Sequence, residues 1–123
     1  MRWAILLAGL SGAVAVGMGA GAAHGLSTRL PAEALGWIKT GAEYQLWHSV
    51  LLAGIGLFGA RGRAFSVSAL LLAVGILIFC GSLYIMALTG MRRLGAVTPF
   101  GGTALIAAWI ALAWGGWRYG RDG

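Results

Sequence analysis

Acidic side chains are scarce in this 123-residue sequence, which contains three of them against nine basic ones. All charged residues together make up 10% of the chain, whereas an ordinary soluble domain carries about 25%. Hydrophobic residues make up 59%, and the mean hydropathy is +0.85. A surface of this composition cannot face mainly water, so we expect the chain to lie within a lipid bilayer.

Cysteine is nearly absent, because Cys80 is the single one in the sequence. One cysteine excludes an intramolecular disulfide, a CxxC redox pair and a zinc site built from cysteines. Cys80 falls inside an apolar stretch, and we interpret it as a small buried hydrophobic residue at a helix contact.

The net charge of +6 and the pI of about 10.8 would indicate nucleic-acid binding in a soluble protein. Here the basic residues bracket the apolar stretches, as expected for side chains that reach lipid headgroups, and we predict no nucleic-acid partner. At one end of the predicted helices lie Arg2, Arg61, Arg63, Arg118 and Arg121, and at the other Arg29, Lys39, Arg92 and Arg93. Counted by the positive-inside rule, five against four predicts that both termini are cytoplasmic.

Four apolar stretches fill most of the chain and predict transmembrane helices over residues 3–26, 40–60, 64–89 and 97–117. A short interfacial helix is predicted over 31–38, with Pro31 in its first turn. The first stretch is long enough to span, so we expect it to be retained and not cleaved as a signal peptide. The predicted fold is all-α: an integral membrane, four-transmembrane-helix, up-and-down bundle that forms one domain over residues 1–123.

Small residues recur every four positions along two of these stretches. Such faces let helix backbones approach closely in a membrane, where dispersion contacts drive association. The two stripes therefore predict surfaces by which helices pack, either within one bundle or between copies of the chain. The first stretch carries Gly9, Ala13, Gly17, Gly21 and Gly25, and the fourth carries Ala107, Ala111 and Gly115.

Most polar side chains fall near one end of the predicted bundle, with His48 about 10 Å below the start of the second span. We interpret this cluster either as a hydrogen-bonded structural network or as a binding site. Glu43 is expected to pair with Lys39, and Thr98 to cap the fourth helix. The candidate residues are His24, Glu43, Tyr44, Gln45, His48, Ser82, Tyr84 and Thr98.

Three sharper readings of this cluster stay open. His24 and His48 would be axial ligands if the protein held a haem. His and Glu side chains are also the titrating groups of proton-coupled transport, although we place neither near the bilayer centre. A metal site from His24, His48 and Glu43 has suitable ligand types but no recognised spacing. We predict no catalytic residues, no metal and no required cofactor.

Several segments together resemble one family of small membrane proteins. They are His24 after the glycine-alanine run, residues 36–41 with 43–45 and His48, residues 81–84, and residues 98–102. This combination is similar to the YgdD-like small inner-membrane proteins, domain of unknown function family 423. The resemblance covers essentially the whole chain. It implies four transmembrane helices in the bacterial cytoplasmic (inner) membrane, and it implies no activity.

The functional hypothesis that follows is a non-enzymatic membrane protein that acts by association. It would be an accessory subunit of a larger membrane complex or a small homo-oligomer, with the bilayer and other membrane subunits, or itself, as partners. The alternative is a transporter or channel for a small solute or ion, gated at the polar end. A second alternative is a haem- or quinone-binding respiratory subunit.

Overall fold

The computed structural model describes residues 1–59 and 62–121, and every regular element in these ranges is helical. In chain order they are α1 (Arg2–Ala23), α2 (Ala32–Phe58), α3 (Arg63–Gly75), the π-helical segment η1 (Ile76–Cys80), α4 (Gly81–Thr89), the 3₁₀ segment η2 (Arg92–Ala96) and α5 (Thr98–Tyr119). Because α3, η1 and α4 follow one another without a break, they form a single rod. The predicted all-α class is confirmed.

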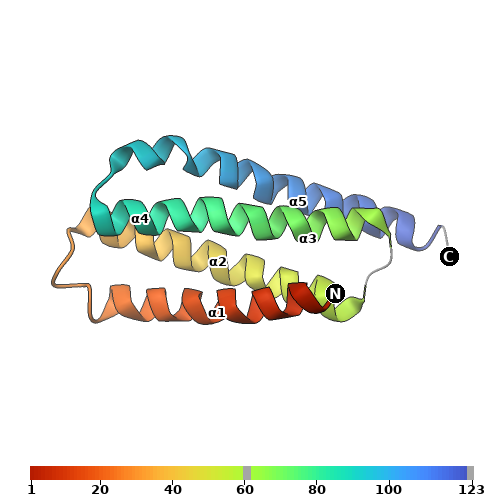
Figure 1. Cartoon of the computed structure of the whole chain (residues 1–123), viewed down its shortest axis with the longest axis horizontal. Coiled ribbons are helices and arrows are strands. Elements are labelled where there is room, and N and C mark those ends of the chain that lie inside the picture. The colour runs from red at the N-terminus through yellow and green to blue at the C-terminus, as the bar shows by residue number, and fades with distance from the viewer. Residues whose placement is uncertain (60–61, 122–123) are drawn as a thin grey trace.

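Four rods therefore make up the molecule, and consecutive rods run in opposite directions (Figure 1). α2 packs against α1 on one side and against the α3–η1–α4 rod on the other, and α5 packs against α3 and η1. The start of α1 and the end of α5 lie at the same end of the bundle, opposite the connection between α1 and α2.

Three helical segments are long and apolar enough to cross a membrane: Arg2–Ala23, Arg63–Thr89 and Arg92–Tyr119. α2 falls short of that hydropathy because polar residues such as Gln45 and His48 lie in its middle. Large apolar side chains cover the outside of the molecule: Leu10 is 70% exposed and Leu77 is 74% exposed. Such a surface is expected to contact lipid.

The predicted helix boundaries need two corrections. The first span ends at Ala23, three residues earlier than expected, because His24 leaves the helical conformation. The second helix is described to Phe58, followed by Gly59 in the left-handed conformation. The predicted end of that span at residue 60, and Arg61, lie outside the described residues. The third and fourth spans agree with prediction to within two residues at each end.

The separate interfacial helix predicted over 31–38 is wrong. Pro31 precedes the helix as its N-cap, and the chain then continues as one helix through Lys39 into the rest of α2. The reason is packing: Ala34 and Ile38 are buried with Ala22 of α1 and Ala87 of α4. Burial of this face holds the first turns within the bundle, aligned with the remainder of α2.

The face by which α1 packs also differs from prediction. Its buried residues are Ala4, Ala8, Ser11, Ala15 and Ala22. The predicted stripe lies on other sides of the helix, and a Cβ added at Gly9 or Gly17 would meet nothing within 4 Å. α1 therefore uses a line of alanines to contact α2 and leaves the stripe of Gly9, Ala13 and Gly17 uncovered.

A close crossing joins α5 to the π-helical segment. A Cβ on Gly101 would come within 2.8 Å of Phe79 Cα and 2.9 Å of the Ile78 carbonyl carbon. Backbone atoms cannot move aside as the tip of a side chain can, so this position accepts only glycine. Further along α5, where it packs against α3, Ser68 Oγ donates a hydrogen bond to the Ala108 carbonyl at 2.8 Å. π-helical turns are often found beside functional sites.

Candidate functional site

The depth of the polar residues follows from the pairing of α1 and α2. Ala22 packs with Ala34 and Ile38 at one end, and Ser11 contacts Gln45 and Ser49 in the middle. Ser11 is close to the centre of the 22-residue α1. Because His48 lies between Gln45 and Ser49 in sequence, it is level with the middle of α1.

This depth corrects the prediction that His48 lies about 10 Å below the start of its helix. α2 begins at Ala32, eight residues before the predicted span, so His48 is 16 residues from the helix start. At 1.5 Å per residue this is about 24 Å. The polar residues of α2 thus extend from near one end of the bundle to its middle, and they are not confined to the end.

A network of polar side chains, which we call the central network, links three helices: Ser11 of α1, Gln45 and Ser49 of α2, and Tyr84 of α4. Gln45 Nε2 donates to Ser11 Oγ at 3.0 Å, and the Tyr84 hydroxyl donates to Gln45 Oε1 at 2.6 Å. Ser49 Oγ lies 2.8 Å from Ser11 Oγ and donates to the Gln45 carbonyl at 2.6 Å. Gln45 therefore uses both ends of its amide to connect α1 to α4.

Tyr84 reaches Gln45 because α2 has a glycine at the contact. A Cβ on Gly41 would lie 2.8 Å from Tyr84 Cε1. A larger residue at Gly41 would therefore push the ring away from α2. Both Gln45 and Ser49 are buried. In the described part of the chain, every buried side-chain nitrogen and oxygen has a hydrogen-bond partner.

His48 makes a second connection, from α2 to α5. Its Nδ1 lies 2.6 Å from the Tyr44 carbonyl, and the Trp109 indole Nε1–H donates to its Nε2 at 3.1 Å. A carbonyl only accepts and an indole only donates, so His48 is neutral with the proton on Nδ1. Trp109, in the middle of α5, is therefore the partner that holds this ring.

Ser82 and Thr98 join α4 to the start of α5, with their hydroxyl oxygens 2.6 Å apart. The predicted capping role of Thr98 is wrong, because no side chain caps α5 and its N-cap is Val97. Thr98 Oγ1 instead lies 3.2 Å from the Leu94 carbonyl, to which it donates. Thr98 therefore fastens the 3₁₀ segment η2 and α4 to the first turn of α5.

His24 and Glu43 do not join these contacts. His24 is exposed at the end of α1, and its side chain forms no hydrogen bond within the described structure. Glu43 is exposed, and among residues 1–59 and 62–121 it makes no ion pair, so the predicted pair with Lys39 is absent. Arg92 forms an ion pair with Glu33, through two hydrogen bonds of 2.7 and 2.8 Å.

The Glu33–Arg92 pair lies at the end of the bundle where α1 connects to α2, which we call the loop end, and it precedes the predicted membrane-spanning part of α2. The hydrogen bonds from Arg92 lower the pKa of the Glu33 carboxyl. Arg92 also lies over the Trp37 ring, 5.6 Å from its centroid. Both partners of the ion pair are exposed, so its contribution to stability is small. These residues are of the kind that mark a membrane interface.

The structure does not bring His24 and His48 together. His24 follows Ala22 and Ala23, which lie level with Ile38, and His48 is ten residues further along α2. The axial separation is therefore about 15 Å. Both nitrogens of His48 are also occupied. The two histidines as placed do not fit a haem held by a pair of axial ligands. No three His, Cys, Asp or Glu side chains gather at one point in the described ranges.

A lateral groove of about 580 Å³ opens beside His48, between α2 and α5. η1 contributes Phe79 to it, and the rings of Tyr44 and Phe79 lie 4.9 Å apart. Glu43 supplies a carboxylate, and Trp47 and Trp109 supply aromatic surface. Carboxylates and aromatic faces together favour a cationic or planar apolar ligand. We use the name lateral groove for the cavity lined by Glu43, Tyr44, Trp47, His48, Phe79, Gly102, Leu105, Ile106 and Trp109.

Sequence reasoning did not identify Ser11, Ser49 and Trp109 as members of the polar contacts. A signal for Ser11 was present: it is the one polar residue between Arg2 and His24. A polar side chain at that depth needs a protein partner, because hydrocarbon offers none. Trp109 also carried a signal, because it falls in the middle of the predicted span over 97–117, whereas the other tryptophans lie near predicted interfaces.

Comparison with known proteins places the chain among membrane proteins. The family described as "Protein of unknown function (DUF423)" matches residues 18–102. A "UPF0382 membrane protein" of Haemophilus influenzae is 43% identical over 117 residues, which cover 93% of each chain. No solved structure matches.

Further relatives come from other bacteria. The "UPF0382 inner membrane protein YgdD" of Escherichia coli K12 is 40% identical over 99% of this chain and 95% of its own length. The "UPF0382 membrane protein YwdK" of Bacillus subtilis is 37% identical over 91% of this chain and 94% of its own length. The resemblance found in the sequence is therefore confirmed: the chain belongs to the DUF423 family and is a multi-pass protein of the inner membrane.

Proposed function

We propose that this protein crosses the membrane four times and acts by association, not as an enzyme, either as an accessory subunit of a membrane complex or as a small homo-oligomer. The observation that carries the proposal is the uncovered stripe of Gly9, Ala13 and Gly17 on α1. Faces of this kind permit close backbone approach between helices in a bilayer.

The fourth crossing is proposed for α2. Its 27 residues extend about 40 Å, against a hydrocarbon thickness of about 30 Å. α2 also lies between α1 and the α3–η1–α4 rod, both of which are long and apolar enough to span. Its buried polar side chains are hydrogen-bonded to α1, α4 and α5, which removes the main cost of placing them in hydrocarbon.

The polar contacts favour a protein that acts by association over one that binds or converts a substrate. The Gln45 amide bonds to α1 and α4, and His48 bonds to α5 through Nε2 and to the Tyr44 carbonyl of its own helix through Nδ1. Groups that are already satisfied in this way hold helices together and are poorly placed to bind or turn over a substrate. The stripe on α1, by contrast, is exposed, and in the described structure a Cβ added at Gly9 or Gly17 would meet no neighbouring helix.

A second candidate function is movement of a small solute or ion through the lateral groove. The specific observations are the mid-depth position of His48 and the exposed Glu43 carboxylate at the groove. The quinone alternative has less support, since His48 Nε2 and Trp109 Nε1 are hydrogen-bonded to each other and are not available to a ligand in the lateral groove.

The Ala13→Phe variant tests the proposal. We expect the wild-type protein, tagged at its own locus and extracted in mild detergent, to give a native mass above that of one chain. Ala13→Phe should reduce that species at least tenfold, because the ring prevents close backbone approach. The thermal unfolding of the isolated chain should not change, since Ala13 is exposed.

Val50→Phe is the matched control, because Val50 is an exposed apolar residue on α2, away from the stripe. It should leave the native mass as in the wild type. A wild-type mass of one bare chain would refute association and leave the second candidate. In that case Glu43→Gln should abolish flux in proteoliposomes while the protein remains folded.

A further inference from the structure

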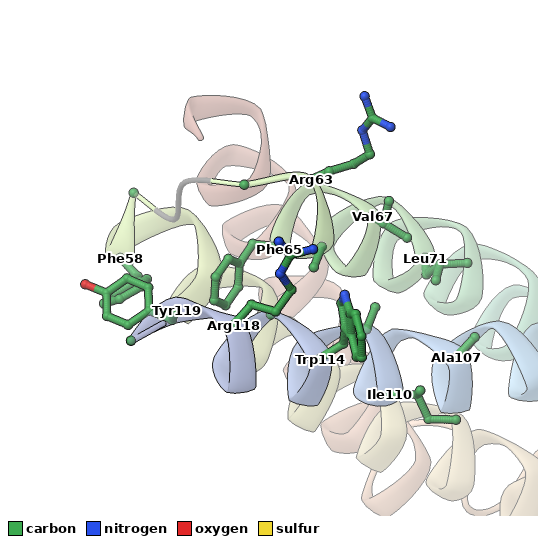
Figure 2. A pocket seen from close by; sticks show the side chains of 16 residues that line it. Phe58, Arg63, Phe65, Val67, Leu71, Ala107, Ile110, Trp114, Arg118 and Tyr119 are labelled. Carbon is green, nitrogen blue, oxygen red and sulfur yellow. The ribbon is translucent and has the colours of Figure 1, made fainter. Parts of the chain in front are cut away.

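We infer that a second groove, at the end of the bundle where α3 begins and α5 ends, binds an anionic phospholipid, with one acyl chain between α3 and α5 and the phosphate at Arg63 and Arg118. This cavity, which we call the terminal groove, has a volume of about 1440 Å³. Figure 2 shows it between α3 and α5, with Phe58, Phe65 and Tyr119 gathered at one end. This inference does not depend on the proposed association.

Small side chains on α5 make the terminal groove. Of the predicted packing stripe, only Gly115 closes fully on α3, where an added Cβ would lie 3.2 Å from the Phe65 ring. Ala107 and Ala111 are half-buried and line the groove. Val67 and Leu71 of α3 also line the groove. The interior is thus apolar, as an acyl chain requires.

The length of the groove matches one leaflet. Its lining residues on α5 extend from Ala107 to Arg118 and beyond. Eleven residues of helix cover about 16 Å, and half of a typical hydrocarbon core is about 15 Å. A lipid with its phosphate at Arg118 would therefore place one chain along the groove down to the middle of the bilayer.

The charge at the mouth selects an anion. Arg63 and Arg118 both line the groove, and Figure 2 shows Arg118 rising from α5 towards α3. Arg2 and Arg121 lie at the same end of the chain's fold. The described acidic residues, Glu33 and Glu43, lie on α2 away from this end, and Asp122 falls outside the described residues. Guanidinium groups are strong partners for phosphate.

The backbone adds to this attraction. α3 begins at Arg63, so its first amide groups and the positive end of its dipole lie at the groove mouth. If both termini are cytoplasmic, the mouth faces the leaflet where anionic lipids attract basic residues. The aromatic rings of Phe58, Phe65 and Tyr119 close the end of the groove beside the headgroup position.

Native mass spectrometry of the purified full chain with defined lipids tests this inference. Phosphatidylglycerol and phosphatidylcholine of identical acyl chains are offered in equal amounts. We expect one phosphatidylglycerol to be retained per chain, at least fivefold over phosphatidylcholine. The double variant Arg63→Gln/Arg118→Gln should remove that preference and bring the ratio of the two lipids to about one, since each cation near a surface contributes to anion binding.

The control is Arg29→Gln/Arg93→Gln, two exposed arginines at the loop end, which should keep the wild-type preference. Ala111→Phe should remove retention of both lipids by filling the groove. Equal loss in the two arginine pairs, or wild-type retention in Ala111→Phe, would overturn the inference. If soluble glycerol phosphate is retained as well as the lipid, the site binds a free anion and the acyl-chain assignment is wrong. The arginine pairs decide the matter even if Ala111→Phe fails to fold, because their side chains are exposed.

Discussion

Replacing Gly101 with alanine should lower the free energy of unfolding by about 2–3 kcal/mol, the upper part of the range for overpacking a closely packed contact. The new Cβ would collide with the backbone of the π-helical segment, at Phe79 Cα and the Ile78 carbonyl carbon. Backbone atoms at this crossing can yield only if α5 separates from η1. The measurement is the unfolding midpoint in a denaturant titration of the detergent-solubilised protein.

Gly102→Ala is the control for this prediction. The neighbouring Cβ would lie 3.6 Å from the Phe79 ring, which is ordinary van der Waals contact. Alanine also favours helix over glycine, so Gly102→Ala should leave stability unchanged or raise it by up to about 1 kcal/mol. Equal midpoints for the two variants would show that α5 does not cross η1 at Gly101.

Replacing Gln45 with leucine should cost about 1–2 kcal/mol of unfolding free energy. The change removes the hydrogen bonds to Ser11 and Tyr84, and it leaves the Tyr84 hydroxyl without its acceptor. Individual side-chain hydrogen bonds in membrane proteins contribute about 0.6 kcal/mol on average and up to about 1.7. The same denaturant titration measures the effect.

Tyr84→Phe tests whether the loss comes from this contact. In a double-mutant cycle, the loss of unfolding free energy in Gln45→Leu/Tyr84→Phe should be smaller than the sum of the two single losses, since both changes remove the same hydrogen bond. Thr103→Val is the control, because the Thr103 hydroxyl is exposed and bonds only within its own helix, to the Pro99 carbonyl. Additive effects in the cycle would contradict the contact between Gln45 and Tyr84.

Helix positions were predictable from the sequence because length and hydropathy determine them. The third span, predicted over 64–89, is the α3–η1–α4 rod from Arg63 to Thr89. The π-helical turn inside it, which lies against Gly101 of α5, was not predicted, because hydropathy and length do not distinguish a π-helical turn from an α-helical one. The start of α2 was missed because Pro31 and the apolar side of the turns after it resemble an interfacial helix, whereas burial of Ala34 and Ile38 decides the outcome.

The choice of packing face shows what hydropathy patterns omit. α1 carries both a stripe that includes Gly9 and Gly17 and a line of alanines, and either would allow close approach. The alanine line contains Ser11, which finds Gln45 and Ser49 on α2. A polar partner across the interface therefore distinguishes between two faces that are equally small.

Five of the eight candidate residues make side-chain hydrogen bonds between or within the helices: Gln45, His48, Ser82, Tyr84 and Thr98. Tyr44 contributes only its main-chain carbonyl, and the side chains of His24 and Glu43 take no part. The partners of His48 were missed because the depth of His48 depends on where α2 begins. The predicted start of α2 was eight residues too late, which placed His48 more than two helical turns too close to the end of the bundle. At that depth His24 would be its partner, whereas the actual partner is Trp109.

The central claim is that α2, despite its polar residues, crosses the membrane and holds the bundle together. Its most direct test is labelling by a membrane-impermeant maleimide in a Cys80→Ala background. Ser27→Cys lies in the connection between α1 and α2, and Gly120→Cys follows α5. Four crossings predict that Ser27→Cys reacts from outside intact cells and that Gly120→Cys reacts only after permeabilisation. Reaction of both from the same side would mean that α2 does not cross, and would contradict the account.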